Sequence, residues 1–187
     1  MNKKDKEQSI VDFENFQWDA SEISKEFSKH IHSEEPLQLI LKCHLIIENM
    51  LIDFITLSLS KPDLLDLDRL NFPIKVQLAL SLDALPIDFP KTFLYLNNLR
   101  NKVAHNLEFL LNDEHKNNFI ETIPISFYSL IFADKDYNSK DFNPSDFSFK
   151  ELLRRYLITI DLFRARYAYY EIKKREAFED LRKALEM

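Results

Sequence analysis

Apolar residues recur every three or four positions over most of the chain, which is the spacing of amphipathic α-helices. The pattern predicts helices over residues 19–31, 36–60, 73–84 and 88–107. Prolines support these boundaries, because proline is tolerated in the first turn of a helix and breaks its interior. The sequence therefore predicts an all-α protein.

The longest predicted helix begins near Ser145 and runs almost to the end of the chain. Its apolar residues step by three and four along one seam: Phe149, Leu153, Tyr156, Ile160, Phe163, Tyr167 and Tyr170. About 38 residues would extend roughly 57 Å, which exceeds what a small bundle needs. We therefore expect the distal part, with Phe178 and Leu181, to pack against a second chain.

The remaining segments are less regular. Residues 113–133 are interrupted by Pro124, and part of them could be extended, but we favour a broken helix. Residues 134–146, rich in Asp, Asn, Ser and Pro, are expected to form the loop before the long helix. Residues 1–15 are expected to be flexible. Together these assignments predict a single-domain, up-and-down helical bundle over residues 1–187, with a long C-terminal helix.

The chain contains no glycine. Phosphate-cradling loops and dinucleotide-binding turns need glycine for positive φ and close backbone approach, so both kinds of nucleotide site are excluded. Asparagine is expected to end helices where glycine usually does. Cys43 is the only cysteine, which excludes an intrachain disulfide, and the five histidines form no metal-binding pattern. We expect neither a metal nor a cofactor.

The formal net charge of −6 does not indicate DNA binding or general nucleic-acid binding. Residues 147–187 nevertheless carry ten Lys/Arg against seven Asp/Glu. This basic end is compatible with RNA binding, and it is also typical of a solvated helix face with ion pairs. The chain opens without the apolar segment of a secretory signal, and its most apolar stretch, 37–59, carries four ionisable residues. We expect a cytoplasmic protein with no membrane span.

Three ionisable residues fall on apolar helix faces. His44 and Glu48 lie one turn apart on the apolar side of the helix over 36–60, and Arg100 lies among apolar residues of the helix over 88–107. A buried guanidinium needs a carboxylate or a phosphate, so we predict that Arg100 pairs with Glu48. That pair could be a structural ion pair or half of a phosphate site, and Glu48 could instead reach solvent at the bundle edge.

His105 lies about 140° round a regular helix from Arg100, so the two do not share a face. Asn101 does share the face of His105, and its amide can orient the imidazole. The alternative is that His105 is a surface residue that interacts with the C-terminal end of the helix dipole.

The segment Arg100-Asn101-Lys102-Val103-Ala104-His105 resembles the motif of the HEPN superfamily, in which an Arg is followed after four to six residues by a His. The expected all-α bundle, with Glu48 in a long preceding helix, is also similar to that superfamily. The resemblance implies a homodimer in which two motifs face each other. It implies a metal-independent endoribonuclease, of the toxin or defence type, that cleaves RNA through attack of the ribose 2′-OH.

By this resemblance His105 acts as general acid and base, Arg100 binds the scissile phosphate, and Asn101 orients the site. His44, Glu48 and Lys102 would support it. Leu107 occupies the position where HEPN toxins paired with a nucleotidyltransferase antitoxin often carry a tyrosine, which speaks against regulation by modification there.

The mannitol operon repressor family has a similar helical bundle and a similar segment. The alternative function is therefore a non-catalytic regulatory or protein-interaction module, and binding of a small ligand or nucleotide is a third. An antitoxin or a regulatory protein is the expected kind of partner besides RNA.

Overall fold

The computed structural model describes residue 16, residues 36–106 and residues 108–186, and in these residues the chain is helical, without a β-strand. The α-helices are α3 (Pro36–Ser58), α4 (Phe72–Ser81), α5 (Phe89–His105), α6 (Asp113–Thr122), α7 (Tyr128–Ile131) and α8 (Phe149–Leu185). Short 3-10 helices cover Pro62–Leu64, Leu67–Arg69, Ile125–Phe127 and Pro144–Asp146. The predicted all-α class is confirmed for these residues. The predicted helix over 19–31 and residues 1–15 lie outside them.

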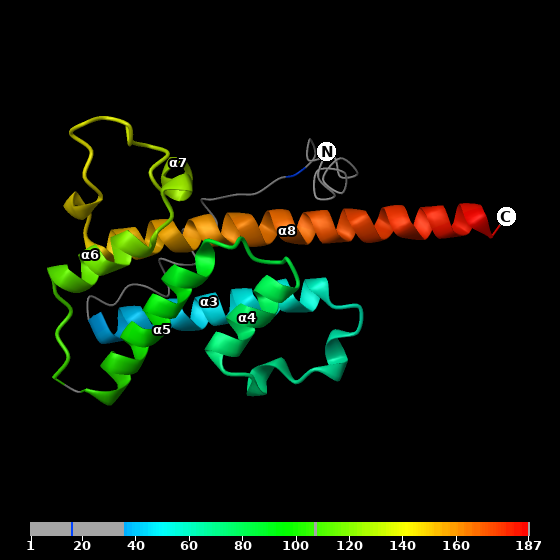
Figure 1. Cartoon of the computed structure of the whole chain (residues 1–187), viewed down its shortest axis with the longest axis horizontal. Helices are drawn as coiled ribbons and strands as arrows, with labels where there is room; N and C mark the ends of the chain where they lie inside the picture. The colour runs from blue at the N-terminus through cyan, green and yellow to red at the C-terminus, as the bar shows by residue number, and fades with distance from the viewer. Residues whose placement is uncertain (1–15, 17–35, 107, 187) are drawn as a thin grey trace.

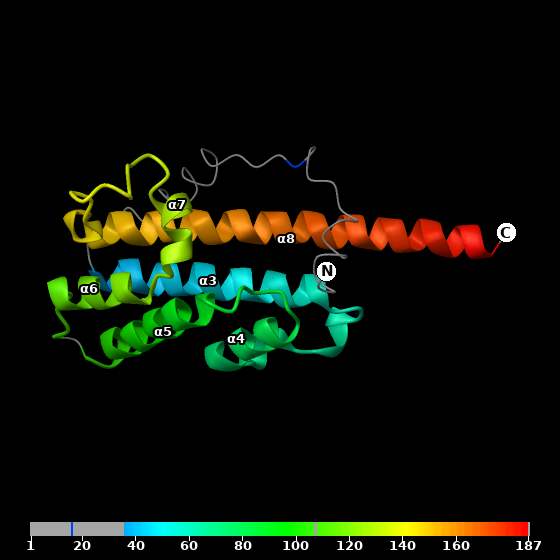
Figure 2. The ribbon, with the colours of Figure 1, turned by 45° about the horizontal axis from the view of Figure 1, so that its top comes forward.

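Helix α3 is central, because it packs against α8, α5 and α4. Figures 1 and 2 show that α3 and α8 run side by side in the same direction, while α5 runs back across α3 at an angle. Residues 123–148 return the chain from the end of α6 to the beginning of α8 (Figure 1). This arrangement leaves the C-terminal end of α5 at one end of the molecule and the end of α8 at the other.

Aromatic rings fill the space where α5 and α8 meet. Phe89 stacks on Phe127 with ring centroids 4.5 Å apart, and the edge of Phe163 meets Phe89 at 5.1 Å. Tyr156 lies edge-on to Phe93 at 6.3 Å. Such stacked and edge-to-face pairs add to the free energy gained from burying the rings. The aromatic cluster therefore fixes the first half of α5 on α8.

The helix boundaries follow local sequence closely. Helices α3 and α5 match the predicted segments 36–60 and 88–107 within two residues at each end. The chain over 113–133 is a broken helix, as predicted, with its break at Pro124 between α6 and the 3-10 turn Ile125–Phe127. Of the described residues, none belongs to a helix long and apolar enough to cross a membrane.

Two boundaries differ from expectation. The turn that follows α4 is made by Asp83, with a φ of 56°, rather than by an asparagine. The N–H of Asp83 donates to the Leu80 carbonyl, and the N–H of Ala84 donates to the Ala79 carbonyl. This is the Schellman arrangement that glycine usually supplies. Helix α8 begins after Ser148 and not near Ser145, because the Ser148 hydroxyl accepts the N–H of Glu151 and so caps the helix.

Candidate functional site

Helix α5 carries the whole Arg100–His105 segment and stays α-helical through His105. Arg100 and Asn101 are half-buried, and Lys102 and His105 are exposed. Because the helix is uninterrupted, Arg100 and His105 point about 140° apart within one chain, as predicted. One chain therefore does not bring the two side chains together.

Asn101 contacts Arg100 instead of His105. The Arg100 Nη1 donates a hydrogen bond of 3.1 Å to the Asn101 Oδ1. The His105 side chain makes no hydrogen bond or ion pair with the described part of the chain. The structure thus assigns Asn101 the role of holding the guanidinium, and the expected orientation of His105 by Asn101 does not occur in this chain.

The predicted Glu48–Arg100 pair does not form. The Glu48 Oε1 instead lies 2.6 Å from the Nζ of Lys75, a side chain of α4 that is almost completely buried. The second oxygen, Oε2, lies 3.9 Å from the Nδ1 of His44. Arg100 is half-buried, and among the described residues it has no carboxylate partner. The prediction was wrong about which cation Glu48 neutralises.

The direction of the helices explains this correction. His44 of α3 and Asn97 of α5 meet through a hydrogen bond of 3.1 Å between Nε2 and Oδ1. Glu48 follows His44 by about 6 Å along α3, and Arg100 follows Asn97 by about 4.5 Å along α5. Since α5 runs back across α3 (Figure 1), these two steps lead away from each other. Glu48 instead contacts Lys75 of α4.

Burial governs the chemistry of His44. Its ring packs on Phe72 with centroids 4.5 Å apart. Burial lowers the pKa of His44 below its ordinary value of 6.5, although the hydrogen bond to Asn97 and the charge of Glu48 oppose this. The charges of Arg100 and Lys75 act in the same direction as burial. His44 is therefore neutral at pH 7 and donates to Asn97 as part of a buried polar network.

Lys75 is the site residue that sequence reasoning missed. A signal was present, because Lys75 lies on the same side of α4 as the buried residues Phe72, Val76 and Ala79. An ammonium group at a core position predicts a carboxylate nearby, just as the position of Glu48 predicted a cation. The helix over 73–84 was predicted correctly as an element, but the direction in which it faces depends on the tertiary fold.

A second polar cluster fixes the returning segment 123–148 to α8. Arg155 donates to both oxygens of Asp134, to the Glu151 carboxylate and to the Ile131 carbonyl, and its guanidinium lies over the Phe147 ring. The Arg155 guanidinium lowers the pKa of Asp134 to about 2. Each charged side chain of this cluster has a partner of opposite charge. The cluster therefore holds the returning segment on α8 and offers no open position for a ligand.

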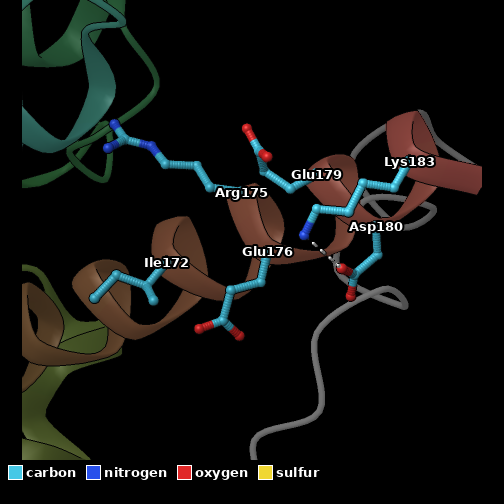
Figure 3. A pocket seen from close by; sticks show the side chains of 6 residues that line it. All are labelled: Ile172, Arg175, Glu176, Glu179, Asp180 and Lys183. Atoms are coloured by element: carbon cyan, nitrogen blue, oxygen red, sulfur yellow. Dashed lines mark ion pairs between the residues drawn. The ribbon is translucent and has the colours of Figure 1, made fainter. Parts of the chain in front are cut away.

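A surface hollow of about 460 Å³ lies along the distal part of α8 (Figure 3). All the described side chains that line it come from this one helix: Ile172, Arg175, Glu176, Glu179, Asp180 and Lys183. Asp180 and Lys183 form an ion pair of 3.8 Å across it. The hollow is remote from the Arg100–His105 segment, at the opposite end of the molecule (Figure 1).

The described residues also contain no group of three or more His, Cys, Asp or Glu side chains that could hold a metal ion.

Comparisons with protein-family models, with curated proteins and with solved structures find no match to this chain. Function is therefore inferred from the residues of the site itself. The site consists of three parts. The Arg100 guanidinium is half-buried and has no carboxylate partner among the described residues, the His105 imidazole is exposed about 140° away round α5, and His44 and Asn97 form a buried hydrogen bond between α3 and α5.

Proposed function

We propose that the protein is a metal-independent endoribonuclease of the HEPN type whose site is completed by two chains. The observation that carries the proposal is the state of Arg100. Its guanidinium is half-buried, and in the described chain it bonds only the neutral amide of Asn101. A partly desolvated guanidinium without a carboxylate is suited to bind a phosphate, which it can contact through two N–H groups at once.

The exposed face of α5 supplies the other groups of the proposed reaction. The exposed His105 side chain can approach a ribose. Lys102, also exposed, adds a positive charge within one helical turn of His105. An imidazole can accept the proton of the 2′-OH near neutral pH. The 2′-oxygen then attacks the phosphorus, the bond from phosphorus to the 5′-oxygen breaks, and the departing oxygen takes up a proton. The products are a 2′,3′-cyclic phosphate end and a 5′-hydroxyl end.

The angle between Arg100 and His105 gives the reason for a dimer. Within one helix the two side chains diverge, so a single phosphate cannot contact both easily. If two α5 helices face each other, Arg100 of one chain and His105 of the other can approach the same phosphate. Developing negative charge on the phosphoryl oxygens would be stabilised by Arg100, while Asn101 keeps that side chain in place.

The test is cleavage of RNA by the purified protein in the presence of EDTA. We expect products with 2′,3′-cyclic phosphate ends, and we expect His105→Ala to abolish cleavage while its helical circular dichroism stays unchanged. Asn98→Ala is the matched control, because Asn98 is also exposed on α5 and has no role in the proposed reaction. Absence of cleavage by the wild-type protein, together with harmless expression in cells whether or not His105 is present, would refute the proposal.

The second candidate is a non-catalytic regulatory or interaction module similar to the mannitol operon repressor. One observation favours it: Arg100 and Asn101 bond to each other, and Asn97 and His44 are used inside the fold. The segment could then serve only to dock α5 on α3. This reading predicts that His105→Ala changes neither cellular phenotype nor partner binding, whereas exchange of surface residues outside α5 does.

A further inference from the structure

Helix α8 extends beyond the body of the protein. Its Tyr167 hydroxyl bonds the hydroxyl of Ser58, the last residue of α3, at 2.8 Å. Further along, Arg175 donates to the carbonyl of Leu57 at 2.5 Å and so caps the C-terminal end of α3. The ten residues of α8 that follow Arg175 add about 15 Å of helix past this contact. Figures 1 and 2 show this end projecting beyond the other described helices.

The projecting end continues the apolar face of α8. Phe178, Leu181 and Leu185 are spaced by three and four residues and fall within an arc of about 60°. The same arc contains Ile160 and Tyr167, which face the core in the first part of the helix. At the projecting end, however, these side chains are 59%, 60% and 86% exposed. Three large apolar side chains on one face of an otherwise charged helix form a surface for another helix.

The charges beside this face are arranged for an antiparallel copy of the same helix. Arg175 and Arg182 are one heptad apart, and so are Glu179 and Glu186, all along one edge of the apolar face. Figure 3 shows Arg175 and Glu179 on the same side of the helix. When a second copy is laid antiparallel, a single register places Arg182 beside the second copy's Glu179, next to the ion pair of 3.5 Å that Arg182 forms with Glu186 of its own helix. Arg175 stays on the carbonyl of Leu57. The same register places Phe178 between Leu181 and Leu185 of the second copy.

The geometry points to the end of α8 as a self-association surface, on which residues 175–186 of a second copy lie antiparallel. A parallel copy fits less well. It would place the remaining helices of both chains at the same end of the paired segment, where α3 already covers the apolar face of α8. A lipid surface fits less well too, since the apolar arc is narrow and the charges on the remaining faces have both signs, with Glu176 and Asp180 beside Lys183.

This surface is independent of the proposed ribonuclease site. The end of α8 and the Arg100–His105 segment lie at opposite ends of the molecule, so antiparallel pairing of α8 does not bring two motifs together (Figure 1). The two proposals therefore fail separately: loss of self-association in an α8 variant says nothing about His105, and an inactive His105 variant should associate like the wild type.

The first experiment is sedimentation velocity over a wide range of protein concentration. We expect the full-length chain to associate reversibly. Leu181→Asp should lower the association constant of the step made through α8 by about tenfold or more, because it places a charge in the apolar contact, while any pairing through α5 is retained. Leu110→Asp is the control: Leu110 is 81% exposed but lies outside α8, so this variant should behave as wild type. A wild-type protein that stays monomeric, or a Leu181→Asp variant that associates unchanged, would overturn the proposal.

The second experiment determines direction by disulfide trapping. Cys43 is fully buried, and burial raises the pKa of its thiol to about 12, so an introduced surface cysteine is the only reactive one. Antiparallel pairing predicts cross-linking when Phe178→Cys and Leu185→Cys variants are mixed. Cross-linking of Phe178→Cys with itself but not with Leu185→Cys would indicate a parallel pair and contradict the proposal.

The charge pattern gives a test by exchange. Arg182→Glu alone should weaken association about tenfold, because it faces the second copy's Glu179 with a like charge. The double variant Arg182→Glu, Glu179→Arg restores opposite charges in the same register and should recover association. Equal behaviour of the single and double variants would rule out the proposed register.

Discussion

Replacing Glu48 by glutamine is expected to destabilise the protein much more than replacing its partner Lys75 by methionine. The two side chains form an ion pair of 2.6 Å between α3 and α4, but they are buried unequally: the Lys75 side chain is 3% exposed and that of Glu48 is 24% exposed. The cost of breaking a buried pair comes from the charge that is left without compensation. Removal of the carboxylate leaves an ammonium group in the core.

Breaking a buried pair costs about 3–5 kcal/mol, and the partial exposure of Glu48 places Glu48→Gln at the lower end, about 3 kcal/mol. Lys75→Met instead removes the buried charge and fills its volume with an apolar chain, while Glu48 can turn to water. We expect a loss of about 1 kcal/mol or less. A domain of this size is stable by about 5–15 kcal/mol in total, so the two variants are easy to distinguish.

The measurement is urea unfolding at pH 7, followed by far-ultraviolet circular dichroism. Glu121→Gln is the matched control, because Glu121 is exposed on α6 and its side chain has no cationic partner among the described residues. If Lys75→Met costs as much as Glu48→Gln or more, the burial argument is wrong, and the pair is held by packing of the Lys75 side chain instead.

Three further predictions concern single groups. The free energy of unfolding should fall as the pH drops below 6.5. Burial lowers the pKa of His44 in the folded protein, so the unfolded chain binds a proton at His44 at higher pH than the folded one does. In denaturation curves measured over a pH series, His44→Gln should remove this contribution to the loss of stability. Tyr156→Phe should leave stability unchanged or raise it by up to about 1 kcal/mol in the same urea assay. The buried Tyr156 hydroxyl lies close to Thr92 but makes no hydrogen bond of ordinary geometry with the described residues, so a clear loss would show that this hydroxyl is bonded. Ser148→Ala should cost about 1 kcal/mol of stability, because it removes the side chain that caps α8. Ser145→Ala should cost less, because Ser145 lies before the helix, and equal effects of the two variants in thermal unfolding would contradict the assigned boundary.

Local sequence was sufficient to predict that α3, α4, α5 and α8 exist, and most of their boundaries within three residues. The spacing of apolar residues and the positions of proline and capping side chains act within one or two turns, so they specify where α3, α5 and α8 lie without knowledge of their neighbours. The same local geometry correctly predicts that Arg100 and His105 diverge by about 140°, because this angle depends only on the helix being continuous.

The partner of each polar side chain was decided by tertiary structure. The sequence predicted that Glu48 needs a cation unless it reaches solvent at the bundle edge, and both Arg100 and Lys75 lie on apolar helix faces. The choice between them depends on the direction of α5 across α3 and on the position of α4, and the His44–Asn97 bond shows where α3 and α5 cross. An ion pair forms between atoms a few ångströms apart, and residues 27 positions apart in sequence are brought to that distance only by the packing of the helices.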